Sequence, residues 1–554
     1  METRYINSDL LIIGGGSAGC MAAIRAHELN PDLKITIFEK GDFKYSGSIT
    51  RGMDALNVVS IPGLTTPELY VESMIKECQG IIDASPSYLM AKRSYDLLKK
   101  LEKWGVYFIH EKDGSYRTLK IHTQGSFLTA MEEPDLKTML AQKVEQAGVK
   151  VFNRIMGLEL LKEDKQVNGA VGIHTRTGHL IVCKAKAVIM TAGGLARFTL
   201  PNSGYLYGTF DYPGNSGDGY TMAFKAGACL TGMEHTERGV LIKDVNIPLL
   251  AVSITRGGKV LDALDSVIME EGCSIYGYEG MVLAMEKGLS PLKIRLSHLP
   301  NEKIEEIEQI LFTTERPIQK RFFKNRNIDF RKQDIELWTT EHQLCGGHGM
   351  SGLYINEKAE STVSGLYAAG DVAAVPKQHL TGAFVFGEVA AEQAVEFVKN
   401  RDKKIGLNSN QVNRIEKKRN GYFDSSGKEI LVHELEYKVR RVIGDYVVSP
   451  KNVYKLERWL ESSKTFKKEL SQQVLARNGH ELSRIFELEN IILCADMSAK
   501  AGLARTESRW GRSHARVDFP ERDDVNWLKH VLVQKEDNSS KAIVSYRPIL
   551  NQLK

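Results

Sequence analysis

Residues 9–19 read Asp9-Leu10-Leu11-Ile12-Ile13-Gly14-Gly15-Gly16-Ser17-Ala18-Gly19, and this stretch decides the fold of the N-terminal part of the chain. The run of apolar residues predicts a buried parallel strand, and the glycines lead into a helix that begins near Ser17. Gly14, Gly16 and Gly19 form a G-x-G-x-x-G motif between that strand and that helix, the context in which the motif binds a dinucleotide. Unpaired N–H groups at the start of the helix would then hold the diphosphate.

A second strand at residues 34–38 ends in Glu39, which lies twenty residues after Gly19. An acidic side chain at this place accepts a hydrogen bond from the ribose of an ADP group. Glycines alone would also fit an ordinary strand-to-helix turn, so the second strand and Glu39 carry the prediction. We therefore expect a dinucleotide site built from residues 14–19 and Glu39.

Length and composition are those of a soluble globular protein with two to four domains. The chain has 554 residues, of which 42% are apolar and 26% charged. No window reaches the roughly 18 consecutive apolar residues of a membrane-spanning helix. The N-terminus does not read as a secretory signal, so we expect a cytoplasmic protein.

Charge is distributed unevenly along the chain. Residues 401–554 hold 30 Lys and Arg against 21 Asp and Glu, whereas the first 400 residues hold 44 against 48. The basic surplus fits either a solvated surface or a docking face for an acidic partner such as a small electron carrier. It is diffuse and lacks interleaved aromatic residues, which argues against nucleic-acid binding.

The cysteines show no metal-binding spacing. An iron–sulfur cluster normally needs four closely placed thiolates. This chain has seven scattered cysteines without a C-x-x-C pair, at positions 20, 78, 183, 229, 273, 345 and 494. A disulfide framework is not indicated either, because the number is odd and the chain is long. Any one-electron relay must therefore come from another subunit, and we expect no metal site in this chain.

The remaining segments suggest a nucleotide-binding domain with an insertion. Helices are expected over 65–104, 134–147, 220–228 and 383–399. Strands are expected over 149–153, near 155–162 and 169–182, and over 186–194, the last of which closes in a glycine pair. From about 240 to 335 the nucleotide-binding pattern gives way to charged helices at 263–272 and 302–313. Amphipathic helices are expected over 430–500.

Three motifs together resemble one known family. They are the glycine motif at 14–19, Gly365-Leu366-Tyr367-Ala368-Ala369-Gly370-Asp371, and the run from Arg505 to Asp518 that contains His514-Ala515-Arg516. Their order resembles the flavoprotein subunit of the succinate dehydrogenase/fumarate reductase family, and is most similar to the alpha subunit of adenylylsulfate reductase. The resemblance spans almost the whole chain.

The resemblance implies an α/β fold: a Rossmann-like FAD-binding domain with an inserted α+β capping domain and a C-terminal helical domain. We expect the FAD-binding domain at 1–240 and 336–402, the capping domain at 241–335 and the C-terminal domain at 403–554. The FAD would lie extended, with its flavin ring between the FAD-binding and capping domains.

The resemblance also implies the residues that hold FAD. These are Gly14, Gly15, Gly16, Ser17, Ala18, Gly19, Glu39, Lys40, Ser46, Gly47, Ser48, Ala192, Gly193, Asp371 and Gly382. In several members a histidine is joined covalently to the flavin, but this chain has Tyr45-Ser46-Gly47 there, so we expect non-covalent FAD. A helix starting after Gly382 would direct its N-terminus at the flavin and stabilise the anionic reduced form.

Four residues are the expected catalytic side chains. Arg256, in Arg256-Gly257-Gly258, resembles the proton-donating arginine of fumarate reductases, and His348 resembles a histidine of adenylylsulfate reductases. Asn57 resembles an active-site asparagine of the latter enzymes. His379 is expected to position substrate or to donate a proton. Structural roles remain open for these residues, and His342 is a second candidate for the substrate-binding histidine.

Two differences from the motifs of the family leave the identity of the substrate undetermined. Dicarboxylate enzymes carry Asn-Arg-Leu-Gly where this chain has Gln378-His379-Leu380-Thr381-Gly382, and histidine cannot reproduce the two-pronged grip of arginine on a carboxylate. The arginine that adenylylsulfate reductases direct at their substrate aligns with Leu241. Phe210 falls near their stacking tryptophan.

We therefore expect an FAD-dependent oxidoreductase that transfers electrons between a small substrate and a ferredoxin-type iron–sulfur partner. One alternative is a self-sufficient flavin oxidase or NAD(P)H-linked reductase. Another is a non-catalytic electron-transfer flavoprotein subunit.

Overall fold

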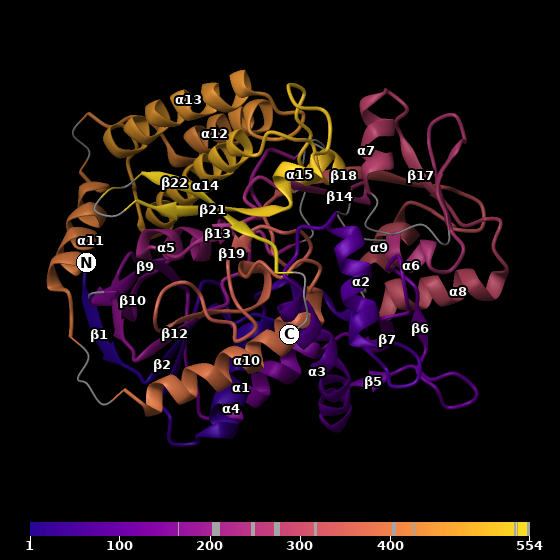
Figure 1. Cartoon of the computed structure of the whole chain (residues 1–554), viewed down its shortest axis with the longest axis horizontal. Coiled ribbons are helices and arrows are strands. Elements are labelled where there is room, and N and C mark those ends of the chain that lie inside the picture. The colour runs from indigo at the N-terminus through magenta and orange to yellow at the C-terminus, as the bar shows by residue number, and fades with distance from the viewer. Residues whose placement is uncertain are drawn as a thin grey trace.

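A five-stranded parallel sheet lies at the centre of the N-terminal part of the molecule (Figure 1). The structure is a computed structural model, and it describes residues 1–163, 165–201, 211–244, 250–270, 278–314, 318–401, 406–424, 427–536, 539 and 541–550. The strand order is β20 (Leu366–Ala368), β12 (Ala187–Met190), β2 (Leu10–Ile13), β3 (Ile35–Glu39) and β8 (Lys150–Asn153). All of β2 is buried, as its apolar run predicts.

Helices cover one face of this sheet and a second sheet covers the other. Helix α1 (Ser17–Leu29) packs along α10 (His379–Lys399) and against α4 (Leu136–Gln146), low in Figure 1. The second sheet has the order β1 (Thr3–Asn7), β11 (Leu180–Lys184), β10 (Gln166–His174) and β9 (Ile155–Glu163). This layering confirms the Rossmann-like fold.

The capping region, at the right of Figure 1, has its own hydrophobic core. Its antiparallel sheet runs β14 (Glu237–Ile242), β18 (Ile335–Gln343), β17 (Leu292–Arg295), β15 (Lys259–Leu261) and β16 (Val267–Met269). Helices α6 (Leu250–Ile254), α7 (Tyr278–Glu286), α8 (Asn301–Gln309) and α9 (Ile318–Asn325) accompany it, with a π-helical segment at Ile310–Thr314. Both β14 and β18 extend beyond the span 241–335.

The prediction of a helix over 263–272 is wrong, because this span contains β16. A turn at Asp262 leads instead into β16, because the Asp262 carboxylate accepts hydrogen bonds from the N–H groups of Leu264 and Ser266. This side-chain-capped turn reverses the chain so that β15 and β16 pair.

An earlier segment, residues 53–133, joins the capping region to the parallel sheet. It holds β4 (Met53–Leu56), α2 (Pro67–Glu77), α3 (Ala84–Lys103), β5 (Tyr107–Phe108), β6 (Thr118–Leu119) and β7 (Leu128–Glu133). Ala55, Ile121 and Leu128 belong to the capping core. A short helix, α5 (Asp218–Ala226), follows β12 and lies before the capping region in the chain.

The C-terminal part is largely helical, as expected, but it also contributes strands. Its helices are α11 (Ser409–Gly421), α12 (Val432–Tyr446), α13 (Val453–Gln472), α14 (Gly479–Ala504) and α15 (Asp524–Trp527). Strands β21 (Lys529–Lys535) and β22 (Ala542–Pro548) form a sheet with β13 (Leu230–Thr231) and β19 (Gly352–Leu353). None of the described helices is long and apolar enough to cross a membrane.

A buried ion network fastens the C-terminal helices to the FAD-binding part. The Arg197 guanidinium bonds the carboxylates of Glu436 on α12 and Glu487 on α14. Arg440, one turn after Glu436, bonds Glu341 on β18 at 2.7 Å. Charged groups removed from water are tolerated when they are paired in this way.

Candidate functional site

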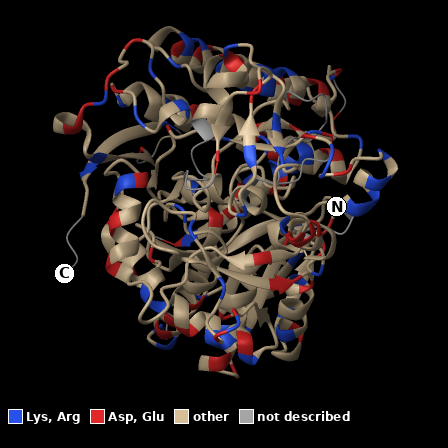
Figure 2. Cartoon of the chain, turned by 90° about the vertical axis from the view of Figure 1, so that its right-hand side faces the viewer, with Lys and Arg blue, Asp and Glu red and all other residues tan. Residues whose placement is uncertain are grey.

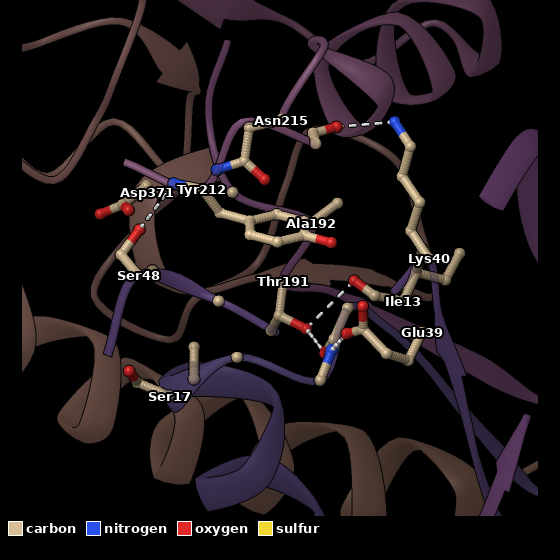
Figure 3. A pocket seen from close by; sticks show the side chains of 18 of the residues that line it. Ile13, Ser17, Glu39, Lys40, Ser48, Thr191, Ala192, Tyr212, Asn215 and Asp371 are labelled. Atoms are coloured by element: carbon tan, nitrogen blue, oxygen red, sulfur yellow. Dashed lines mark hydrogen bonds between the residues drawn. The ribbon is translucent and has the colours of Figure 1, made fainter. Parts of the chain in front are cut away.

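A long cavity opens at the carboxyl ends of β2, β3, β12 and β20 (Figure 3), where ligands bind in open α/β sheets. It encloses about 810 Å³ of space, including its mouth. Most of the residues that the sequence predicted for FAD binding line it: Gly14, Gly15, Gly16, Ser17, Ala18, Glu39, Lys40, Gly47, Ser48, Ala192, Gly193 and Asp371. In Figure 3, Glu39 and Lys40 mark one end and Ser48 and Asp371 the other.

The glycine motif leaves room for a diphosphate where the sequence predicts it. Gly14 has a φ of +108°, and a Cβ there would lie 2.3 Å from the carbonyl oxygen of Thr191. A Cβ on Gly19 would lie 2.0 Å from the carbonyl oxygen of Gly14, so only glycine lets α1 pack this close to β2. Nothing lies within 4 Å of a Cβ built on Gly16, so this position faces open space at the start of α1.

Glu39 fixes the shape of the glycine turn. One carboxylate oxygen accepts a hydrogen bond from the N–H of Gly15 at 2.8 Å, and the other accepts one from the N–H of Gly41 at 2.6 Å. The side chain is buried, so these bonds are sheltered from water. Glu39 therefore organises the turn in addition to its expected ribose contact.

Lys40 is part of the buried ion network that contains Arg197 and Glu487. Its Nζ donates to the carboxylate of Asp218 at 2.8 Å and lies 2.8 Å from that of Glu487. Although burial favours the neutral amine, these two carboxylates raise the pKa of Lys40 above its usual value. The cavity wall at this end is thus coupled to helix α14.

At the other end, the structure brings together two of the expected catalytic histidines. The ring of His348 packs edge-on against the ring of His379, with 4.9 Å between centroids. The Nε2 atom of His348 lies 3.8 Å from the carboxylate of Asp211, which also accepts a hydrogen bond from Ser48. His348 is therefore near the Ser48 end of the cavity, and 23% of its side chain is exposed.

His379 lies at the start of α10, and Asn57 lies next to a residue that bonds its first turn. This helix begins at His379, so the expectation that it starts after Gly382 is wrong, and Gly382 lies inside its first turn. The N–H of Val58 donates to the hydroxyl of Thr381 at 3.2 Å, which places the neighbouring Asn57 beside that turn. Burial, then the charges of His348, Lys377 and His122, lowers the pKa of His379 well below its ordinary value.

Arg256 lies elsewhere. Its Nε donates to the Glu306 carboxylate at 2.9 Å and an Nη donates to the carbonyl of Val252, so its bonds are internal to the capping region. It lines neither the long cavity nor the second cavity described below. Ser46 is buried but does not line the cavity, and Phe210 lies outside the described residues.

Some cavity residues escaped the sequence analysis. Thr191 donates its hydroxyl to the carbonyl of Gly14 at 2.7 Å, which fastens the β12 turn to the glycine motif. It directly precedes Ala192 and Gly193, so adjacency to the predicted pair was an available signal. Tyr212 and Asn215 cross the cavity in Figure 3 from a loop rich in glycine and polar residues, where composition alone does not say which side chain points inward.

A second cavity of about 1150 Å³, including its mouth, lies beyond the loop 346–349. A Cβ on Gly347 would clash with Asp371 of the first cavity, and one on Gly349 would lie 3.3 Å from His235 of the second. The charged and histidine side chains that line the second cavity come from segments far apart in the sequence. They are Glu77, His235, Glu237, Arg238, Glu286, His342, Lys377 and Arg512. One loop thus separates the two cavities.

The buried imidazoles of the second cavity are neutral near pH 7. Burial, then the charges of Lys377 and Lys451, lowers the pKa of His235 to about 3. Burial, then the charges of Arg238 and Lys451, lowers the pKa of His342 well below its ordinary value. These rings can act as hydrogen-bond donors or acceptors but not as cations.

Two family models cover most of the chain. The FAD binding domain model matches residues 9–239, and the fumarate reductase flavoprotein C-terminal model matches residues 437–553. The chain belongs to the succinate dehydrogenase/fumarate reductase flavoprotein family. It is an FAD-dependent oxidoreductase flavoprotein, which confirms the resemblance and the expectation of an FAD enzyme.

Curated relatives of this flavoprotein family match over their whole length. An uncharacterized FAD-dependent oxidoreductase of Methanocaldococcus jannaschii is 27% identical over 562 positions, which cover 96% of each chain. One subunit of the fumarate reductase (CoM/CoB) of Methanothermobacter marburgensis is 25% identical, and the match covers 97% of this chain and 98% of that relative.

Solved structures show the same fold. Adenylylsulfate reductase from Archaeoglobus fulgidus superposes with a TM-score of 0.89 at 24% identity, covering 100% of this chain and 98% of its own. Quinol fumarate reductase of E. coli gives a TM-score of 0.84 at 20% identity, covering 99% and 97%. At 24% and 20% identity, these superpositions show a shared fold.

The first cavity fits the FAD of this family. It offers open space at Gly16 against the first turn of α1, a carboxylate at Glu39 for a ribose, and an elongated shape that ends at Ser48 and Asp371. FAD supplies the redox chemistry when bound, while the protein binds it, orients it and handles protons. His348 and His379 are the expected catalytic side chains that lie near its Ser48 end.

Proposed function

We propose that this flavoprotein oxidises or reduces a small substrate beside the Ser48 end of the FAD cavity and exchanges electrons with a ferredoxin-type iron–sulfur partner. The observation that carries the proposal is the His348–His379 contact, with 4.9 Å between ring centroids, beside the end of the cavity opposite Glu39. A pair of imidazoles there can position a substrate and hold or move a proton at its reacting atom.

Several relatives are named as subunits of larger enzymes. They include the subunit of the Methanothermobacter marburgensis fumarate reductase and the fumarate reductase flavoprotein subunits of Serratia and Haemophilus influenzae. These names support a multi-subunit enzyme in which this chain carries the flavin. Figure 2 shows basic and acidic residues interspersed along the chain, as seen from the side that faces the viewer.

The FAD is held without a covalent bond. Tyr45 stands in the loop where some family members carry a flavin-linked histidine, and this residue is 75% exposed. The diphosphate and ribose contacts of residues 14–19 and Glu39 therefore carry the affinity. Acid precipitation of the holoprotein should leave the yellow colour in the supernatant, and colour retained in the pellet would contradict this proposal.

Reoxidation of the reduced flavin tests the partner. The holoprotein is photoreduced without oxygen and mixed either with an oxidised two-cluster ferredoxin or with air-saturated buffer. We expect faster reoxidation by the ferredoxin. Faster reaction with oxygen, accompanied by stoichiometric peroxide, would support a self-sufficient oxidase instead.

A further inference from the structure

One buried tyrosine hydroxyl contacts both ends of the loop that separates the two cavities. Tyr220, on α5, is fully buried, and its hydroxyl lies 3.2 Å from the carbonyl oxygen of Leu344 and 2.9 Å from that of Ser351. These two carbonyls flank loop 346–349. The same hydroxyl lies 3.1 Å from the carbonyl oxygen of Asp371, which lines the FAD cavity. Tyr220 therefore joins loop 346–349 to the wall of that cavity.

The three carbonyl oxygens share a single hydrogen, because a phenol hydroxyl donates only one. Burial, and to a smaller extent Cys345 and Asp371, raises the pKa of Tyr220 well above its usual value, so the hydroxyl keeps its proton at neutral pH. Without this hydroxyl, the carbonyl oxygens would face the apolar edge of a ring in a site that excludes water. A buried acceptor that loses its donor is costly, so the loop ends would have to move apart.

Helix α5, which carries Tyr220, is itself held firmly in place. The carboxylate of Asp218, its first residue, accepts hydrogen bonds from Lys40 Nζ at 2.8 Å and from the side-chain amide of Asn490 on α14 at 2.9 Å. Thr221 donates its hydroxyl to the amide oxygen of Asn490 at 2.8 Å. The hydroxyl of Tyr220 thus projects from a fixed base, as a group that positions another residue must.

Loop 346–349 also contacts the start of α10. The N–H of His379 donates to the carbonyl of Gly347 at 3.2 Å, and the ring of His348 packs against that of His379. Because a Cβ on Gly347 would clash with the Asp371 carboxylate, the loop lies tightly against the FAD cavity. The relative placement of His348 and His379 therefore depends on how the two loop ends are held.

We infer that Tyr220 is a positioning residue for His348: its hydroxyl fixes both ends of loop 346–349 and thereby sets the contact of His348 with His379. The inference rests on the proposed function, which places the reacting part of the flavin at the Ser48 end of the FAD cavity. A polar side chain held near a flavin favours one of its redox states over the other. Displacement of His348 should therefore change the redox equilibrium of the bound flavin.

Redox titration of the Tyr220→Phe holoprotein against a reference dye tests the inference. We expect the ratio of reduced to oxidised flavin at a fixed potential to change about threefold or more, which corresponds to about 14 mV for a two-electron couple. Tyr422→Phe is the matched control, because Tyr422 is also buried and its hydroxyl donates to Glu489 in the C-terminal part. The control should keep the native ratio, and a Tyr220→Phe ratio equal to that of the control would overturn the inference.

A double variant separates positioning of His348 from a general loss of stability. His348→Gln should shift the same redox equilibrium. Adding Tyr220→Phe to His348→Gln should produce no further shift, because the imidazole that Tyr220 positions is then absent. A Tyr220→Phe shift that persists at full size in the double variant would overturn the inference.

If Tyr220→Phe does not fold, hydrogen exchange of the native holoprotein provides the test. The N–H groups of Gly346 and Ser351 donate to the carbonyls of Asp371 and Cys345, so the peptide that spans 344–352 should exchange as slowly as α5. Exchange as fast as that of the exposed turn at 111–115 would overturn the inference. These measurements use neither substrate nor partner, so faster flavin reoxidation by oxygen than by ferredoxin would contradict the proposed function and leave this inference intact.

Discussion

Replacing Glu39 by glutamine separates the two roles of this residue in the FAD site. The native carboxylate accepts one hydrogen bond from Gly15 N–H and one from Gly41 N–H, and only 4% of the residue is exposed. Glutamine has nearly the same shape, but its amide offers one acceptor oxygen and one donor NH₂ group. One of the two backbone N–H groups must then face a donor.

The size of the effect follows from those two bonds. A hydrogen bond to a charged acceptor contributes about 1.5–3 kcal/mol, and a buried N–H left without a partner costs about 1–3 kcal/mol. Because glutamine keeps one of the two acceptors, the free energy of unfolding of the apoprotein should fall by about 2–3 kcal/mol. FAD affinity should fall at least tenfold, which corresponds to about 1.4 kcal/mol, since the turn relaxes and the ribose loses its charged acceptor.

Urea unfolding of the apoprotein and FAD titration by tryptophan fluorescence measure the two quantities. Glu28→Gln serves as control, because Glu28 lies at the exposed end of α1, where its pairs with Arg25 and Lys100 contribute little. Unfolding free energy and FAD affinity in Glu39→Gln that equal those of the control would refute the assigned role of Glu39.

Three further changes test other parts of the structure. Arg197→Leu leaves Glu436 and Glu487 buried without this partner, so urea unfolding should show a loss of about 3–5 kcal/mol; a loss below 1 kcal/mol would contradict a stabilising network. Burial lowers the pKa of Lys451 to about 7, so between pH 7 and 10 the unfolded chain binds a proton that the folded chain does not. The free energy of unfolding should therefore rise with pH, by up to about 1.4 kcal/mol per pH unit, and Lys451→Met should lose this contribution. If the native protein and Lys451→Met show equal slopes of unfolding free energy against pH, the lowered pKa of Lys451 is excluded as the cause. His379→Gln should retain FAD but slow substrate-dependent flavin reduction about 100-fold, and an unchanged stopped-flow rate would remove His379 from the chemistry.

Local signals are sufficient to predict the first buried strand, the first helix and the strand that ends at Glu39. The apolar run of β2, the glycines and Glu39 lie within about thirty residues, so the sequence carries the whole unit, and the cavity residues 14–18 follow from it. The pairing of β21 with β13 does not follow from local signals, because Val533 pairs with Leu230, about three hundred residues earlier in the chain.

The lining of the second cavity also could not be predicted from local sequence signals. His235 and Arg238 come from one segment, and Lys377 and Arg512 come from two others, so no spacing in the chain indicates that all four share a lining. A short motif favours Arg256 as a catalytic residue, yet its position is set by Glu306 on α8. Such pairings arise from tertiary packing, which a motif does not encode.

FAD titration of the native apoprotein is the decisive measurement for the proposed flavin site. The structure predicts one FAD per chain, released in full by acid, and loss of binding in Gly14→Ala, whose Cβ would lie 2.3 Å from the Thr191 carbonyl oxygen. A native protein that folds but takes up no FAD, or a Gly14→Ala variant that binds it with native affinity, would contradict the flavin site at residues 14–19.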